Sequence, residues 1–125
     1  MDLDIYQERA MTTCMESSKN PMYMLLMLGE EVGELQGKFS KNIRKGNIKI
    51  NENRLENLTE NEEFVIEFED LVKKEIGDIM WGCAGLCSVM GWKLNEIGQM
   101  NLDKLQARKA IGTIDGNGDG IERSK

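Results

Sequence analysis

Two pairs of acidic residues with identical spacing are the part of this sequence best suited to chemistry. Glu31 and Glu34 are three positions apart, and Glu75 and Asp78 repeat this spacing. Residues three positions apart on an α-helix lie roughly 60° apart around its axis and project to the same side. Both pairs also take the same position relative to the apolar stripe of their segment. If the two stripes pack together, four carboxylates are expected to converge at the edge of the apolar core.

A site with four carboxylates needs a positive charge. The four groups repel one another by several kcal/mol unless they are protonated or neutralised by a cation. Ligands that are all oxygen select a hard ion, and acids that leave positions open for water and phosphate are characteristic of Mg²⁺, with Mn²⁺ as a possible substitute. A single pair of this kind is common on solvated helix faces. Two pairs in matching phase, each with a glycine before its second acid, favour a metal site.

A polar run in residues 94–110 is the third chemical feature. The apolar stripe that begins with Leu94 and Ile97 continues at the same spacing as Asn101, Lys104 and Arg108. These side chains are suited to phosphates that a metal does not cover, with lysine as a point charge and arginine as a fork. Alternatively, the two cations only complement the negative end of the helix dipole. The spacing fits both interpretations.

The elements that carry these residues are predicted to be helices. Four segments have helical periodicity, and no segment shows sustained period-2 alternation, so the sequence predicts an all-α fold. The predicted helices span residues 3–17, 21–43, 59–90 and 94–110. Thr59 followed by Glu62 matches a capping box at the start of the third helix, and Gly91 is expected to end it.

The rest of the chain is predicted to be irregular. Residues 46–60 are rich in asparagine and charge and are expected to form a loop, or a loop with a short helix. Residues 112–125 contain four glycines and no apolar periodicity, so an irregular tail is expected there. Residues 1–111 would then form a single helical catalytic domain with an insert at 46–60.

Composition excludes several kinds of function. The chain has 125 residues, no histidine and a net charge of −6. Without histidine there is no Ser-His-Asp or Cys-His nucleophile and no HExxH zinc site. The acidic balance argues against nucleic acid as a partner, and the longest apolar stretch, residues 22–28, is too short to span a membrane. Three cysteines without a disulfide pattern predict a cytoplasmic location.

Taken together, these residues resemble the all-α nucleoside triphosphate pyrophosphohydrolases, the MazG-like group that also takes in dimeric dUTPases and phosphoribosyl-ATP pyrophosphatases. The signature of that group is ExxE followed by ExxD, matched by Glu31, Glu34, Glu75 and Asp78. The matching blocks are Tyr6-Gln7, GEEVGEL at 29–35, KKEIGDIMW at 73–81, NLDKLQAR at 101–108 and the tail GTIDGNGDGIER. The resemblance covers most of the chain except the 46–60 insert.

The resemblance implies a four-to-five-helix bundle that hydrolyses a nucleoside triphosphate to the monophosphate and pyrophosphate. It implies that the four acids hold Mg²⁺ while water attacks a phosphorus of the α–β linkage. Asn101 and Lys104 match substrate-contacting positions on the last helix, and Arg108 matches a recurrent position of the family. The alternative is a non-catalytic helical interaction protein that keeps the fold without turnover. Which base or sugar is preferred stays open.

Self-association is expected because the third predicted helix is apolar on more than one side. Trp81 points nearly opposite the stripe formed by Ile79, Cys83, Leu86 and Met90. A monomer of this size would expose a large apolar patch. We therefore expect a homodimer or homotetramer, with Trp81 at or near a subunit contact or against the substrate base. Relatives in the family are also usually oligomeric.

Overall fold

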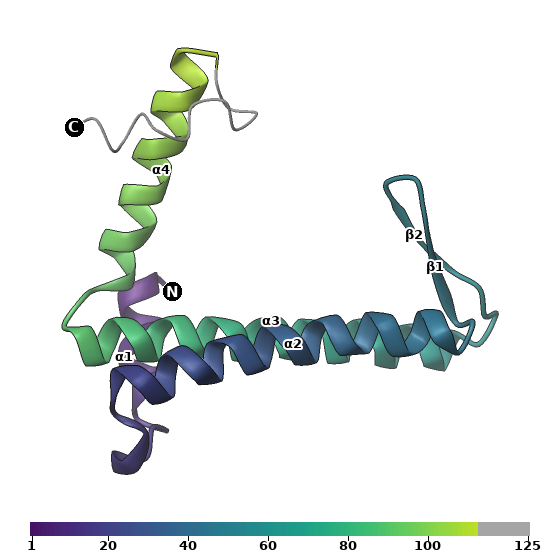
Figure 1. The fold of residues 1–125 in the computed structure, drawn as a ribbon, viewed down its shortest axis with the longest axis horizontal. Helices are drawn as coiled ribbons and strands as arrows, with labels where there is room; N and C mark the ends of the chain where they lie inside the picture. The colour runs from purple at the N-terminus through teal and green to yellow at the C-terminus, as the bar shows by residue number, and fades with distance from the viewer. Residues whose placement is uncertain (113–125) are drawn as a thin grey trace.

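The computed structural model describes residues 1–112, and these are mostly helical, as predicted. Two long helices lie side by side along the molecule, a short helix crosses them, and a fourth helix stands away from the pair (Figure 1). In chain order the elements are α1 (Leu3–Met11), a 3₁₀ turn (Glu16–Ser18), α2 (Pro21–Arg44), β1 (Ile48–Asn51), β2 (Arg54–Asn57), α3 (Glu62–Met90) and α4 (Leu94–Ala110). Residues 113–125, which hold nearly all of the predicted tail, lie outside the described residues.

The α2–α3 pair packs closely because α3 carries small residues where the two helices meet. A side chain at Gly82 would approach Leu28 Cδ1 to 3.1 Å, and one at Gly85 would collide with Met24. Met24 is fully buried at this contact. Large side chains on α2 therefore fill the space that the α3 glycines leave, which fixes how the two helices lie against each other.

The first helix is shorter than predicted. Helix α1 ends at Met11, and the chain reaches the 3₁₀ turn at residues 16–18 before α2 begins. The hydroxyl groups of Thr12 and Thr13 donate to the carbonyls of Arg9 and Ala10, at 2.6 and 2.7 Å. These hydroxyls bond to carbonyls of the last turn and so favour a helix end there. The prediction of one helix over residues 3–17 is wrong for this reason.

Helix α1 covers Trp81. The indole nitrogen of Trp81 donates to Ala10 O at 3.2 Å and to Thr13 Oγ1 at 3.0 Å. Part of the Trp81 side chain that was expected to face another subunit therefore contacts the chain's own first helix, and the subunit contact itself stays a prediction. Trp81 is half-buried in this contact.

The insert at 46–60 contains a β-hairpin, so the prediction of a loop or a loop with a short helix is wrong. Strands β1 and β2 pair antiparallel, with Ile48 opposite Asn57 and Asn51 opposite Arg54. Each strand has four residues, and only Ile48 is buried, with 1% of its surface exposed. Glu52 adopts a positive φ of 56° in the turn. Strands this short, with no continuous buried face, leave almost no periodic signal in the sequence.

The ends of α3 agree only in part with the prediction. Gly91 ends the helix in the left-handed conformation, with φ of 76°, as expected. At the start, the cap is Asn61, whose side chain accepts from Phe64 N at 3.2 Å. Thr59 Oγ1 instead accepts from the backbone of Asn61 at 3.2 Å. The predicted Thr59–Glu62 capping box is therefore replaced by an asparagine cap two residues later.

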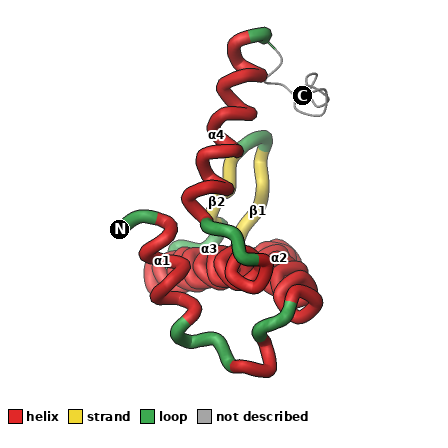
Figure 2. Tube along the Cα trace, turned by 90° about the vertical axis from the view of Figure 1, so that its left-hand side faces the viewer, coloured by secondary structure: helices red, strands yellow, loops and turns green. Residues whose placement is uncertain are grey.

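Helix α4 has the predicted bounds and is fastened to α1 at its first turn. Gln7 accepts from Leu94 N at 2.9 Å while donating to Ser88 Oγ and Trp92 O, both at 2.9 Å. Asp4 accepts from Asn95 N at 2.9 Å. Two of the free amides at the helix start are satisfied in this way. Beyond this turn α4 leads away from the α2–α3 pair and has no buried residue (Figures 1 and 2).

None of the helices in residues 1–112 is both long and apolar enough to cross a membrane.

Candidate functional site

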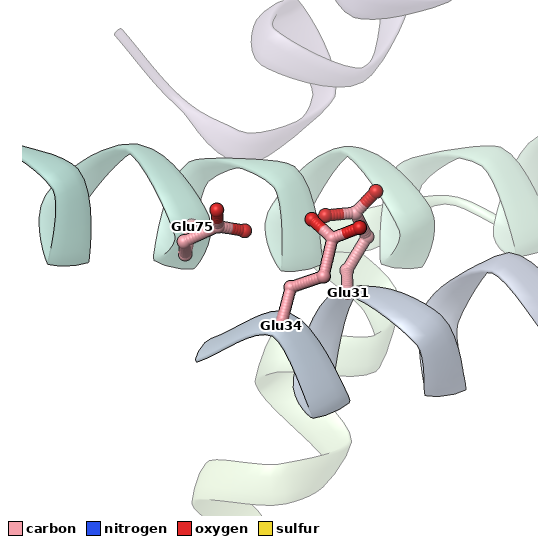
Figure 3. A group of neighbouring side chains, drawn as sticks. All are labelled: Glu31, Glu34 and Glu75. Carbon is pink, nitrogen blue, oxygen red and sulfur yellow. The ribbon is translucent and has the colours of Figure 1, made fainter. Parts of the chain in front are cut away.

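Three of the four predicted acids meet between the two long helices. Glu31 and Glu34 project from α2, and Glu75 projects from α3 toward them (Figure 3). One carboxylate oxygen from each of the three lies within 4.8 Å of the others. Glu75 is buried, Glu31 is half-buried and Glu34 is exposed. The cluster therefore has a dry side at α3 and an open side at α2, which suits a ligand that enters from solvent.

Two oxygens of this cluster have no hydrogen-bond donor. Glu31 Oε2 and Glu75 Oε2 are both buried, and neither has a partner among the described residues. A buried carboxylate oxygen that lacks a donor is costly, and a cation can supply the missing partner. Because all the available ligand atoms are carboxylate oxygens, the donor set fits a hard divalent ion such as Mg²⁺.

The electrostatics of the cluster are visible in Glu31. Burial raises the pKa of this carboxyl above its ordinary value, and the charges of Glu34, Asp78, Glu75 and Glu30 raise it further. Both causes disfavour the charged form. A bound cation would lower the pKa of Glu31, because its positive charge stabilises the ionised carboxylate.

Asp78 lies at the edge of the cluster. It is exposed and is not among the three acids that lie within 4.8 Å of one another. Its charge nevertheless raises the pKa of Glu31. The pKa of Tyr6 on α1 is raised first by burial and second by the charge of Asp78. Asp78 therefore lies close enough to Glu31 and Tyr6 to act on both. Its role as a fourth metal ligand stays a prediction.

Lys38 is a neighbour of the cluster that the sequence analysis did not identify. Its Nζ lies 3.9 Å from Glu75 Oε1, across the two helices. Lys38 follows Glu34 by four residues on α2, so the two project from the same side of the helix. This spacing is the signal that could have revealed it.

The residues predicted on the last helix are not brought to the acids of the same chain. Asn101 and Lys104 line a cavity of about 290 Å³ with Ile97 and Met100, and none of the acids borders that cavity. Asn101 is exposed, and Lys104 and Arg108 are half-buried. Because α4 leads away from the long pair (Figure 1), these residues and the acids form two separate groups within one chain.

Comparison with known proteins agrees with the geometry. The MazG nucleotide pyrophosphohydrolase domain matches residues 19–111. The chain is also similar to the Gene 37 protein of Mycobacterium phage L5, with 33% identity over 127 residues, covering 95% of this chain and 98% of that protein. No solved structure matches the chain. The matched region contains α2, α3 and α4, and with them every acid of the cluster; the chain belongs to the MazG nucleotide pyrophosphohydrolase family.

Proposed function

We propose that this protein is a Mg²⁺-dependent nucleoside triphosphate pyrophosphohydrolase. The observation that carries the proposal is the meeting of Glu31, Glu34 and Glu75, with two buried oxygens that lack donors. Membership of the MazG family supports the same reaction class. Mg²⁺, or Mn²⁺ in its place, would neutralise the phosphates of the substrate and lower the pKa of a coordinated water.

In the proposed reaction, a water oxygen bonds to a phosphorus of the α–β linkage. The bond from that phosphorus to the bridging oxygen breaks. When water attacks the α-phosphorus, the bridging oxygen keeps the electron pair of this bond and leaves as part of pyrophosphate. The water proton passes to a carboxylate of the cluster and then to solvent. Glu31, Glu34 and Glu75 would hold the cation, and the cation would orient the phosphates and the attacking water.

We also propose that the active assembly contains more than one copy of the chain, as a homodimer or homotetramer. Along α4, the apolar residues Met100, Leu102 and Leu105 are exposed, with 61%, 53% and 38% of their surfaces accessible. Exposed apolar side chains of this kind favour packing against another subunit. Such packing would bring Asn101, Lys104 and Arg108 to the substrate bound at the acids of a neighbouring copy. This arrangement reconciles the position of α4 with the substrate-binding role expected for these residues.

A screen of nucleoside triphosphates with Mg²⁺, measuring pyrophosphate release, tests the proposed function. We expect release with at least one nucleotide, its loss in EDTA, and its loss in Glu75→Gln. Glu69→Gln is the matched control, because Glu69 is an exposed glutamate of the same helix outside the cluster. If no nucleotide is hydrolysed, the proposal fails and the non-catalytic interaction protein becomes the better account. If Glu75→Gln keeps full activity, the site is assigned wrongly.

A further inference from the structure

A second cavity lies beside the acid cluster, toward the β-hairpin. Its volume is about 310 Å³. Lys38 and Lys41 of α2 and Lys45, which caps the C-terminus of that helix, form one wall, and Phe64 and Phe68 of α3 lie on the other. By spacing alone, a basic run of this kind at a helix end is typical of a solvated surface. The structure instead gathers them around one space, which we call the lysine cavity.

The lysine cavity and the acid cluster share a boundary. Lys38 lines the cavity and also lies 3.9 Å from Glu75 Oε1. From Glu34, the next side chains on this side of α2 are Lys38, Lys41 and Lys45. With a rise of about 1.5 Å per residue, Lys38 lies about 6 Å and Lys41 about 10 Å along the axis from Glu34. A ligand that reaches from the acids into the cavity would therefore contact the bound cation at one end and the lysine ammonium groups at the other.

The charges of the cavity favour an anion. Its lining contains three lysines and a single acid, Glu67. In the part of the chain that the structure describes, Lys41 and Lys45 form no ion pair, whereas Lys19 and Lys74 each pair with an acid at 2.9 Å. The rings of Phe64 and Phe68 line one side of the cavity, and a surface of low dielectric strengthens the attraction between an ammonium group and a phosphate.

Hydrogen bonds and a ring contact hold the residues around the lysine cavity in place. Asn42 donates to Lys38 O at 2.8 Å, and Asn47 donates to Asn42 Oδ1 at 3.1 Å. On the opposite wall, the rings of Phe64 and Phe68 stack with centroids 5.9 Å apart. The backbone and the aromatic wall of the cavity are therefore in place before a ligand binds, and the ordering cost on binding falls on the lysine side chains.

We infer that the lysine cavity binds condensed phosphate: the terminal phosphates of the substrate, which leave as pyrophosphate. This inference rests on the proposed function and extends it by assigning the leaving group to Lys41 and Lys45. The aromatic wall could also suit a nucleobase, but the three lysines favour an anionic group over a neutral ring. Discrimination of triphosphates from shorter nucleotides would then arise in this cavity.

Calorimetric titration with inorganic pyrophosphate, with Mg²⁺ present and no nucleotide, tests this inference without turnover. The double variant Lys41→Gln/Lys45→Gln is expected to raise the Kd for pyrophosphate at least tenfold and to leave the Kd for Mg²⁺ alone unchanged. Both lysines are exposed, so circular dichroism should show an intact fold. Lys93→Gln is the control for charge, because Lys93 is exposed and lies before α4, outside the cavity lining. The Lys41→Arg/Lys45→Arg variant should retain binding.

Each result has a definite meaning for this inference. An unchanged Kd for pyrophosphate in the double glutamine variant overturns it, even if the protein hydrolyses triphosphates. An altered preference among bases with an unchanged Kd for pyrophosphate also overturns it and assigns the cavity to the base. Lysine-dependent binding of pyrophosphate in a protein that hydrolyses no triphosphate supports the anion site and rejects the proposed function alone.

Discussion

Lys38 and Glu75 face each other across the two long helices, with Nζ 3.9 Å from Oε1. This pair joins the acid cluster to the lysine cavity, because Lys38 belongs to both surroundings. Glu75 is buried and its second oxygen lacks a donor, so Lys38 is its one ion-pair partner among residues 1–112. A cation bound at the cluster would supply a second positive charge beside Glu75, so that the carboxylate would rely less on Lys38. The relationship between the two residues leads to the first prediction.

Lys38→Gln should lower the free energy of unfolding of the metal-free protein by no more than about 1 kcal/mol, since the ion pair is long and Lys38 is partly exposed. Saturating Mg²⁺ should reduce the difference, because the metal replaces the missing positive charge beside Glu75. Urea unfolding in EDTA and in Mg²⁺ measures both values. Lys74→Gln, which breaks an exposed pair on α3, is the control and should have a smaller effect in either buffer. If the loss of unfolding free energy in Lys38→Gln were the same in EDTA and in Mg²⁺, this account of Glu75 would be contradicted.

The raised pKa of Glu31 predicts how stability depends on pH in the absence of metal. The folded protein binds the proton of Glu31 more tightly than the unfolded chain does, because burial and four neighbouring acids disfavour the charged form. The contribution of Glu31 is therefore fully present below the ordinary glutamate pKa of about 4.5 and is lost as the pH rises through the raised value. Relative to wild type, Glu31→Gln should gain stability as the pH rises from about 4 to about 7.

Urea unfolding in EDTA across this range measures the prediction for Glu31, with Glu69→Gln as a control that should follow wild type. Mg²⁺ should remove the advantage of Glu31→Gln, because the ionised carboxylate is then stabilised. A difference between Glu31→Gln and wild type that does not change with pH would mean that Glu31 is not perturbed by its neighbours.

The acids are expected to act as a unit in turnover. Glu34→Gln or Asp78→Asn should reduce turnover with Mg²⁺ by orders of magnitude, because a ligand charge is lost while the helical fold remains. The two variants also separate two roles: Glu34 lies within the group of three, whereas Asp78 lies at its edge. Steady-state kinetics and Mg²⁺ titrations measure the effects. Near wild-type activity in Asp78→Asn would remove Asp78 from the site and leave the three glutamates.

Lys104→Ala should raise KM for a triphosphate and lower turnover, and Arg108→Ala should have a smaller effect. If α4 acts on the acids of another copy, mixing the inactive Glu75→Gln protein with the impaired Lys104→Ala protein should give more activity than the two proteins show separately. Mixed assemblies then contain some sites with both groups intact. A mixture whose activity does not rise after subunit exchange, with the exchange confirmed by mass spectrometry, would assign Lys104 to the acids of its own chain or to no site.

The sequence predicted the end of one helix and both ends of another correctly. Gly91 ends α3 because the left-handed conformation suits glycine, and α4 has the predicted bounds. The end of α1 was missed because the hydroxyls of Thr12 and Thr13 bond to the helix's own last carbonyls. The hairpin was missed because Ile48 alone anchors it. Neither signal is periodic, so neither is visible to an analysis of hydrophobic patterns.

The sequence predicted the meeting of three acids in the candidate site, but not the neighbouring lysine or the direction of α4. The matching phase of the two acidic pairs correctly placed Glu31, Glu34 and Glu75 together. The contact of Lys38 with Glu75 depends on how the two helices lie along each other, which packing around Met24 and Gly85 determines. The direction of α4 depends on the hydrogen bonds that Gln7 accepts from Leu94 N and donates to Ser88 and Trp92, all more than 80 residues away in the chain. Such long-range contacts do not follow from spacing in one segment.

Phosphorus NMR of a nucleoside triphosphate incubated with the wild-type protein and Mg²⁺ tests the central claim most directly. The account predicts that resonances of a nucleoside monophosphate and pyrophosphate grow together, and that EDTA or Glu75→Gln abolishes both. Formation of a nucleoside diphosphate and inorganic phosphate, or no hydrolysis of any nucleotide in the screen, would contradict it.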